Sequence, residues 1–275
     1  MPGKCILLGE HAVLRGHPAI VFPLRSKQLE LNWSFSPRAD TEVEVVQEDW
    51  QSPVLRCLEA VGKIISVPSG FWKFSLTSTI PMQGGLGSSA ALAVAFTKVF
   101  HSLGLVPDAE MFPFALNIEN VFHGTSSGLD IAAVLHDQAI RFVRGSQPQK
   151  FTPVWRPHLY LLDTGFRSST KICVEQVERL QRPDLDREMG LLAKTAFHAL
   201  RDTRESGLPN LAEAMIGGLE IFRAWNLVPV NIEQLIPRAI SAGAIAVKPT
   251  GSGFGGFLLC LFEQEVQDPL FVSLF

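Results

Sequence analysis

The sequence lacks long hydrophobic runs. Its longest apolar segments, such as Ala90–Phe96 and Phe257–Phe262, are well short of the roughly 20 residues that a membrane-spanning helix needs. No secretory leader is visible either, because Lys4 leads directly into the short apolar segment Cys5–Leu8. We therefore expect a soluble, cytoplasmic protein without a membrane partner.

Basic charge and cysteine are also scarce. The chain has 24 Lys and Arg against 27 Asp and Glu, a net charge of -3, and no basic stripe interleaved with aromatic residues, which argues against nucleic acid as a partner. Its four cysteines stand far apart without a Cys-x-x-Cys pair, so we expect reduced, structural thiols. What remains is a 275-residue globular chain that can bury one large core or two modest ones.

No internal repeat is visible, which argues against a solenoid or a propeller. Apolar runs and alternation predict strands in the first part at residues 5–8, 29–34, 42–46 and 72–76, and helices at 88–103 and about 113–122. The helix from residue 88 is apolar almost all round, which is typical of a helix buried on every side. Beyond a boundary at 145–148 we predict a strand at 159–162, helices at 168–180, 185–204, 208–225 and 231–242, and a β pair at 244–247 and 257–262. The pattern predicts an α+β fold with domains 1–145 and 146–275.

The strongest motif is the glycine-rich segment from Pro81 to Ala90, which leads into the buried helix. Its glycines let the backbone turn tightly, and the free N–H groups and dipole of a helix start attract anions. It is not a Walker A loop, because no Gly-Lys-Ser/Thr follows the glycines. The alternative is an ordinary turn in which a serine caps the helix. The residues concerned are Gly84, Gly85, Gly87, Ser88 and Ser89.

A second glycine cluster runs from Lys248 to Gly256 and contains Gly251 and Gly253. It formally matches Gly-x-Gly-x-x-Gly, but it leads into an apolar strand instead of a helix, which disfavours a dinucleotide site. Two separate glycine loops suit a clamp on a phosphorylated ligand. A structural hairpin turn is the alternative for this second loop.

Titratable residues gather in two further segments. Lys4, Glu10 and His11 flank the apolar N-terminal strand, and Glu119 precedes a turn that starts a short helix carrying Asp130. An Asp in a first helical turn can be a simple helix-start preference, or it can serve as a base or an electrostatic anchor. Lys4 and His11 likewise have ordinary structural interpretations, as a solvated terminus and a partly buried histidine.

Together these segments resemble the GHMP kinases. The signatures are an N-terminal Pro-Gly-Lys with Gly-Glu-His-Ala-Val, a central Pro-x-x-x-Gly-Leu-Gly-Ser-Ser-Ala, and a C-terminal Lys-x-Thr-Gly-Ser-Gly-x-Gly-Gly. Residues 9–13 and 123–130 are most similar to the mevalonate-phosphorylating branch of that family. The resemblance spans residues 2 to about 262, and it implies an N-terminal domain like ribosomal protein S5 domain 2, a ferredoxin-like C-terminal domain and an active site between them.

The resemblance also implies roles for individual residues. Asp130 would act on the acceptor hydroxyl with Lys4 beside it, and Ser89 and Glu119 would hold Mg²⁺. Glu10, His11 and Thr170 would line the acceptor pocket. The residues that would bind ATP are Gly84, Gly85, Gly87, Ser88, Ser89, Gly251 and Gly253. The implied ligands are ATP and mevalonate. A homodimer is the assembly that we expect, although the resemblance itself does not imply one.

Some positions depart from the family pattern and leave the acceptor open. Gly217 and Gly218 stand where relatives often have Asn-His, and Phe254 replaces a common glycine. A phosphomevalonate kinase, a sugar kinase and a non-catalytic ligand sensor are the alternatives. Few cations accompany the acceptor segments, chiefly Arg167 and Lys171 besides the N-terminal lysine, which favours an unphosphorylated acceptor with one carboxylate.

Overall fold

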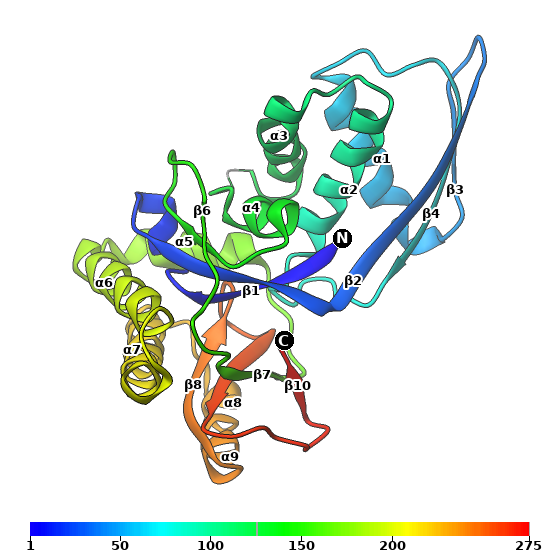
Figure 1. Cartoon of the computed structure of the whole chain (residues 1–275). Helices are drawn as coiled ribbons and strands as arrows, with labels where there is room; N and C mark the ends of the chain where they lie inside the picture. Colours follow the sequence, from blue (N-terminus) through cyan, green and yellow to red (C-terminus); the bar gives the residue numbers. More distant parts are fainter. Residues whose placement is uncertain (125, 275) are drawn as a thin grey trace.

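The computed structural model describes residues 1–124 and 126–274, whose strands form two sheets (Figure 1). The first sheet has the order β3-β4-β2-β5-β6, and β1 pairs with β2. Its strands are β1 (Pro2–Leu8), β2 (Ala19–Pro37), β3 (Glu42–Val45), β4 (Gly70–Ser78), β5 (Ile140–Phe142) and β6 (Gln149–Lys150). The helices of this part are α1 (Gln51–Gly62), α2 (Ser88–Ser102), α3 (Met111–His123) and α4 (Leu129–His136).

The two halves of strand β2 lie in different environments. Residues 19–24 are buried without alternation and pair with β1 and β5, whereas residues 29–37 pair with β4 and are mostly half-buried or exposed. The predicted strand at 29–34 therefore covers only the outer half. The inner half was not predicted for two reasons. Residues 19–24 are apolar throughout, so they do not show the period of two, and they include Pro23, which is unusual inside a strand.

Helix α2 lies at the centre of the first core, as its apolar surface predicts. Nearly every residue from Ala90 to Phe100 is buried. The alternation in β4 is also confirmed, because Trp72, Phe74 and Leu76 are buried and face this helix side, with the rings of Phe74 and Phe96 5.2 Å apart. The core thus fixes the start of α2, where the first glycine loop ends.

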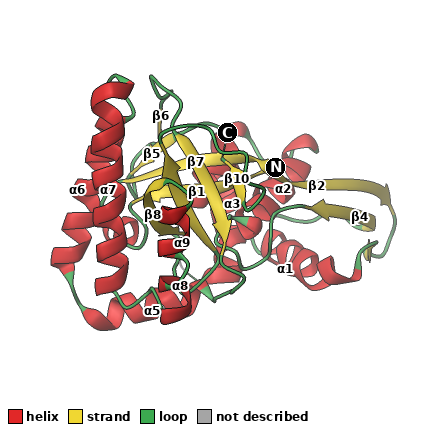
Figure 2. Cartoon of the chain, turned by 90° about the horizontal axis from the view of Figure 1, so that it is seen from below, coloured by secondary structure: helices red, strands yellow, loops and turns green. Residues whose placement is uncertain are grey.

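The second sheet has the order β10-β7-β9-β8. Its strands are β7 (His158–Asp163), β8 (Ala244–Thr250), β9 (Phe257–Phe262) and β10 (Phe271–Ser273). The helices are α5 (Thr170–Leu180), α6 (Pro183–Ala199), α7 (Arg204–Ala224), α8 (Val230–Glu233) and α9 (Ile236–Ser241). Helices α6 and α7 lie side by side (Figure 2). Each part combines a sheet with helices, which confirms the α+β prediction.

Three predictions of elements need correction. Helix α1 was not predicted; its Pro53 lies in the first turn, where a helix tolerates proline. The single helix expected at 231–242 is two short helices, because Pro237 is tolerated only near a helix start and begins α9 afresh. The helix expected from residue 208 begins at Arg204 and contains a proline in its interior.

The two parts meet along β1 and β8. The Thr250 hydroxyl donates to the Ile6 carbonyl oxygen over 2.8 Å, and the Cys5 sulfur lies 3.4 Å from the same hydroxyl oxygen. This contact brings the second glycine loop beside the first. The domain boundary at 145 stays a prediction, and the pairing of β6 with β5 would move it beyond Lys150.

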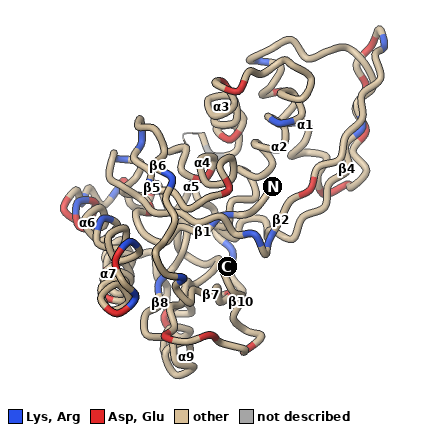
Figure 3. Tube along the Cα trace, in the orientation of Figure 1, with Lys and Arg blue, Asp and Glu red and all other residues tan. Residues whose placement is uncertain are grey.

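Charges of both signs are mixed over the surface, most visibly on α6 and α7 (Figure 3), in keeping with the small net charge. In the described part of the chain, no helix has the length and apolar character that crossing a bilayer requires. The four cysteines are free and buried, as predicted.

Candidate active site

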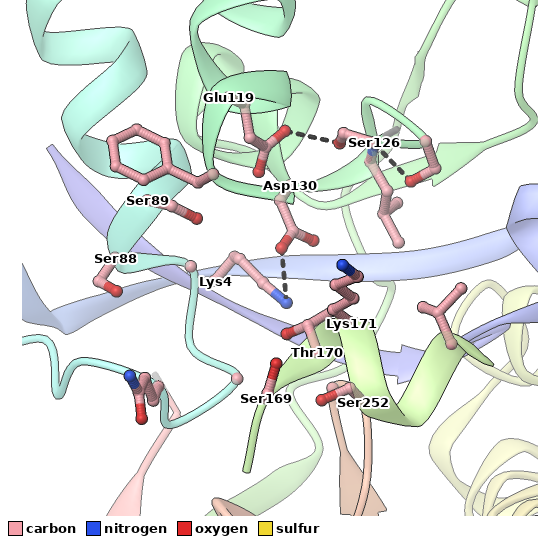
Figure 4. Close-up of a pocket in the computed structure, with 18 of the residues that line it drawn as sticks. Lys4, Ser88, Ser89, Glu119, Ser126, Asp130, Ser169, Thr170, Lys171 and Ser252 are labelled. Carbon is pink, nitrogen blue, oxygen red and sulfur yellow. Dashed lines mark hydrogen bonds and ion pairs between the residues drawn. The ribbon is translucent and has the colours of Figure 1, made fainter. Parts of the chain in front are cut away.

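A cavity of about 440 Å³ opens between the two parts of the molecule (Figure 4). Its wall is made by β1, the starts of α2, α4 and α5, the end of α3, and the loop after β8. Segments that are far apart in the sequence therefore meet at one place, and four of them are the motifs singled out above.

Lys4 and Asp130 form an ion pair at the middle of this cavity. The Lys4 Nζ lies 2.9 Å from the Asp130 Oδ2. The Lys4 side chain is only 3% exposed, whereas that of Asp130 is 27% exposed, so the carboxylate is the partner that remains accessible to a ligand. Figure 4 shows this pair between the start of α2 and the start of α5.

The start of α4 holds Asp130 in place. The Ser127 hydroxyl oxygen accepts a hydrogen bond from the Leu129 N–H, and the Ser126 hydroxyl oxygen accepts one from the Gly128 N–H, both over 3.2 Å. The turn predicted before this helix is confirmed. Because these bonds fix the first turn, they also fix the direction of the carboxylate.

The first glycine loop ends at Gly87, which precedes α2 with a φ of 81°. A Cβ atom there would lie 2.7 Å from the Lys4 Cγ, so the lysine stem packs against the bare backbone. The N-cap residue of α2 is Gly87, so neither Ser88 nor Ser89 stands at the cap position. The helix start with its two hydroxyls borders the cavity instead.

The two glycine loops touch each other. A Cβ atom on Gly251 would lie 3.1 Å from the Cα and the carbonyl oxygen of Gly85. Gly85, Gly87 and Gly251 line the cavity. Gly84 packs against the Phe257 ring and Gly253 against Leu227, so these two glycines support the loops from behind.

Glu119 on α3 is almost fully buried beside Asp130. Its Oε2 accepts a hydrogen bond from the Ser126 hydroxyl over 2.7 Å. Burial, together with the negative charge of Asp130, raises the pKa of Glu119 to about 8. Ser89 lines the same stretch of wall. A buried carboxylate short of positive charge, next to a hydroxyl, fits a small divalent cation with oxygen ligands.

Glu10 and His11 follow β1 at the other end of the cavity. Glu10 is 2% exposed, and its Oε1 lies 2.6 Å from the Nζ of the fully buried Lys248. The His11 Nε2 lies 2.9 Å from the Ser252 carbonyl oxygen, and the imidazole meets the Trp225 ring edge-on at 5.3 Å. Burial lowers the pKa of His11 to about 4, so the imidazole is neutral near pH 7.

The His11 backbone is strained, with a φ of 57° and a ψ of -51°. Such conformations persist only where the surroundings hold them. Here the carbonyl of Ser252 and the indole of Trp225 hold the ring from the second part of the molecule.

The start of α5 forms another part of the cavity wall. Thr170 and Lys171 line the cavity, and Figure 4 shows both on the cavity side of the helix. The Ser168 hydroxyl donates to the Gly253 carbonyl oxygen over 2.6 Å, which ties this segment to the second glycine loop. Arg167 instead pairs with Asp163 at 2.7 Å.

The structure therefore brings together the predicted residues Lys4, Glu10, His11, Gly85, Gly87, Ser88, Ser89, Glu119, Asp130, Thr170 and Gly251. No role was predicted for Lys248, which is fully buried, or for Trp50, Arg56 and Phe122. The last three also line the cavity. The Lys-x-Thr spacing in β8 carried a signal for Lys248, because residues two apart on a strand share a face.

Comparison with protein-family models gives a match in each part of the chain. The model described as "GHMP kinases N terminal domain" matches residues 52–138. The model described as "GHMP kinases C terminal" matches residues 226–270. The first match contains Ser89, Glu119 and Asp130, and the second contains the second glycine loop.

Curated relatives extend over almost the whole chain. The sequence is 32% identical to the mevalonate kinase of Aeropyrum pernix, in an alignment that covers 97% of this chain and 89% of the relative. It is 28% identical to the mevalonate kinase of Thermococcus gammatolerans, with the same coverage.

Solved structures share the fold. The mevalonate kinase of L. major in complex with R-mevalonate superposes with a TM-score of 0.77 at 22% identity, covering 96% of this chain and 86% of that one. The galactokinase of Lactococcus lactis complexed with galactose has the same TM-score at 17% identity, covering 95% and 84%. These superpositions, with the two family models, confirm the predicted two-domain fold. From these matches and the extent of the 32% identity, the chain belongs to the GHMP kinases, a family of ATP-dependent small-molecule kinases.

Proposed function

We propose that the protein transfers the γ-phosphoryl group of ATP to the primary hydroxyl of (R)-mevalonate. The observation that carries the proposal is the Lys4–Asp130 pair, 2.9 Å long, beside the start of α2 in a cavity shared by both domains. The acceptor is suggested by the curated relatives, which are mevalonate kinases.

The nucleotide would lie along one half of the cavity. Backbone N–H groups at the start of α2 and along the glycine loop suit the phosphates, because a helix N-terminus attracts anions. The far end suits the adenine base, since Trp50, Pro53 and Phe122 offer apolar surface there. The Arg56 guanidinium lies 4.7 Å from the centre of the Phe122 ring, which stiffens that wall.

Mg²⁺ belongs with ATP in this proposal. Ser89 and Glu119 would hold it, and it would neutralise charge on the phosphates. Glu119 supports this assignment because its carboxylate is buried beside the negative charge of Asp130.

The transfer step forms a bond between the acceptor oxygen and the γ-phosphorus and breaks the bond from that phosphorus to the β–γ bridging oxygen, so that ADP leaves. The acceptor proton passes to the Asp130 carboxylate, whether early or late in the step. Lys4 keeps that carboxylate oriented and offsets the negative charge that gathers in the transition state.

The acceptor end suits a small carboxylic acid. In the described residues, Lys4, Arg56 and Lys171 are the lysines and arginines that line the cavity. Lys4 is paired with Asp130. The Arg56 guanidinium donates to the Val121 carbonyl oxygen, at the end proposed for the adenine base. Lys171 lies 4.0 Å from the Glu175 Oε1 on its own helix, and its side chain is 76% exposed. A surface pair of that length is weak, so Lys171 is the cation that can turn to meet one carboxylate. A phosphorylated acceptor would call for a denser group of cations.

A sugar is a poorer fit than mevalonate. Ile6, Val13 and Leu14 add apolar surface at the acceptor end, and a ring of hydroxyls would leave polar groups unpaired against it. The galactokinase shares the fold with an equal TM-score, so the backbone alone does not separate the two acceptors.

The test is ADP release measured in a coupled assay with mevalonate, phosphomevalonate, homoserine and galactose side by side. We expect the highest kcat/KM with mevalonate. A higher kcat/KM with phosphomevalonate or galactose would reject the acceptor while leaving the kinase assignment intact. A cytoplasmic location and a homodimer complete the proposal and remain to be tested by fractionation and by light scattering.

A further inference from the structure

Lys248 is fully buried, and the mechanism above gives it no role. Its Nζ donates to the Glu10 Oε1 over 2.6 Å and to the Pro249 carbonyl oxygen over 2.5 Å, and it lies 5.2 Å from the centre of the Phe222 ring. A buried ammonium is costly unless it is paired and hydrogen-bonded. These contacts hold the ammonium in one orientation against Glu10.

The path of the lysine side chain is fixed by α7. A Cβ atom on Gly218 would lie 3.3 Å from the Lys248 Cε and 2.6 Å from the Leu8 Cδ2. The bare backbone of Gly218 thus leaves room for the lysine stem between α7 and β1.

Two residues further along β8, on the same face of the strand, Thr250 donates to the Ile6 carbonyl oxygen. Strand β8 therefore holds the N-terminal segment at two points, through Ile6 and through Glu10.

Glu10 uses only one of its carboxylate oxygens in this pair. Its Oε2 is buried and has no hydrogen-bond partner among the residues that the structure describes. Glu10 also borders the cavity. A buried acceptor left without a donor is costly, and a ligand hydroxyl would supply the donor. The carboxylate of an acceptor would not, because two anions repel each other.

We propose that Lys248 is a positioning residue that holds the Glu10 carboxylate so that its Oε2 accepts a hydrogen bond from the second hydroxyl of the acceptor, the one that is not phosphorylated. In (R)-mevalonate this is the tertiary hydroxyl on C3, so the inference rests on the proposed function. The pair then selects acceptors with that hydroxyl, since a site built to bind a hydroxyl disfavours the analogue that lacks it.

The test compares mevalonate with 5-hydroxy-3-methylpentanoate, which keeps the carboxylate, the methyl group and the primary hydroxyl but lacks the tertiary hydroxyl. The measured quantity is the ratio of their kcat/KM values. For the wild type we expect about a tenfold to hundredfold preference for mevalonate, as for one hydrogen bond to a charged group.

Two variants isolate the pair. Lys248→Met removes the cation, and Lys248→Met together with Glu10→Leu replaces both charges by apolar groups, a change that buried ion pairs often tolerate in stability. In both variants the preference should fall to within about threefold of unity. The double variant carries the test if the single variant does not fold.

The control is Arg223→Met, which breaks an ion pair with Glu233 that lies outside the cavity. It should keep the wild-type preference. A purely structural role for Lys248 would lower kcat/KM equally for both acceptors and leave their ratio unchanged, and that result would overturn the inference. Absence of turnover of either acceptor by the wild type would overturn the proposed function and the inference together.

Discussion

The two ends of the cavity are built in different ways. The end that we propose for the phosphates consists of a glycine loop, a helix start and a short ion pair between Lys4 and Asp130. The acceptor end depends on contacts across the molecule, because Glu10 meets Lys248 and His11 meets Ser252. The phosphate end thus follows from local motifs, whereas acceptor choice depends on how the domains pack. Substitutions at the two ends should therefore change different kinetic constants.

The largest effect should come from Asp130→Asn. An amide cannot take the acceptor proton, so kcat should fall by at least about a hundredfold, while affinity for ATP stays nearly unchanged. Steady-state kinetics and binding of a fluorescent ATP analogue measure the two quantities.

A matched control for this change is Asp137→Asn. Asp137 is a residue whose side chain is 49% exposed; it pairs with Arg25 and has a φ of 47°, which Asn tolerates. The control should keep the wild-type kcat. Near-normal turnover by the Asp130 variant would remove this residue from the mechanism.

Gly87→Ala should damage the phosphate end next. The added Cβ would lie 2.7 Å from the Lys4 Cγ, at a φ of 81°, so the lysine must move away from Asp130. We expect about a tenfold loss in kcat and a loss of about 1–3 kcal/mol in the free energy of unfolding. Kinetics and urea denaturation measure these effects.

Gly104→Ala separates the clash from the backbone strain. Gly104 has a φ of 74°, but a Cβ atom added there would have no heavy atom within 4 Å beyond its chain neighbours. This variant should lose stability and keep its kcat. Equal kinetic losses in both variants would show that the contact with Lys4 is unimportant.

His11→Leu should affect the acceptor end alone. It removes the contact between the imidazole and the Ser252 carbonyl, and we expect the KM for mevalonate to rise about tenfold while the KM for ATP changes less than about twofold. His101→Leu, at the far end of α2, is the control. Equal changes in both KM values would contradict a division between the two ends.

The smallest effect concerns pH and Glu119. Its pKa is about 8 in the folded protein against an ordinary value of 4.5, so the folded state retains a proton that the unfolded state loses between these values. Stability should therefore fall as pH rises from about 5 to about 8, on the order of 2–4 kcal/mol. Urea denaturation at several pH values measures the slope.

Glu119→Gln should flatten that slope. Mg²⁺ with ATP should stabilise the wild type near pH 8 more than it stabilises this variant, because the cation would bind the ionised carboxylate. The same pH slope in both proteins would exclude Glu119 as its source.

The sequence predicted the elements whose apolar residues follow a clear local pattern. The alternation of Trp72, Phe74 and Leu76 predicted β4, and the apolar surface from Ala90 onward predicted a buried α2. Two helices were not predicted correctly: α1 was not predicted at all, and Pro237 begins α9 within the segment that the pattern predicted as one helix.

The acceptor end was only partly predictable for a different reason. Glu10 and Lys248 are 238 residues apart, and no local period indicates that they pair. The wall that we propose for the adenine base likewise forms where Trp50 and Phe122 converge from separate elements. Such contacts depend on tertiary packing, which motifs alone do not specify.

The most direct measurement is proton-coupled phosphorus NMR of the product formed from mevalonate and ATP with Mg²⁺. We predict a phosphate ester whose phosphorus signal is split into a triplet by the two protons of the adjacent carbon, because the primary hydroxyl meets Asp130 and the tertiary hydroxyl meets Glu10. An unsplit ester signal, from phosphate on the tertiary oxygen, or the absence of any new ester would contradict this account.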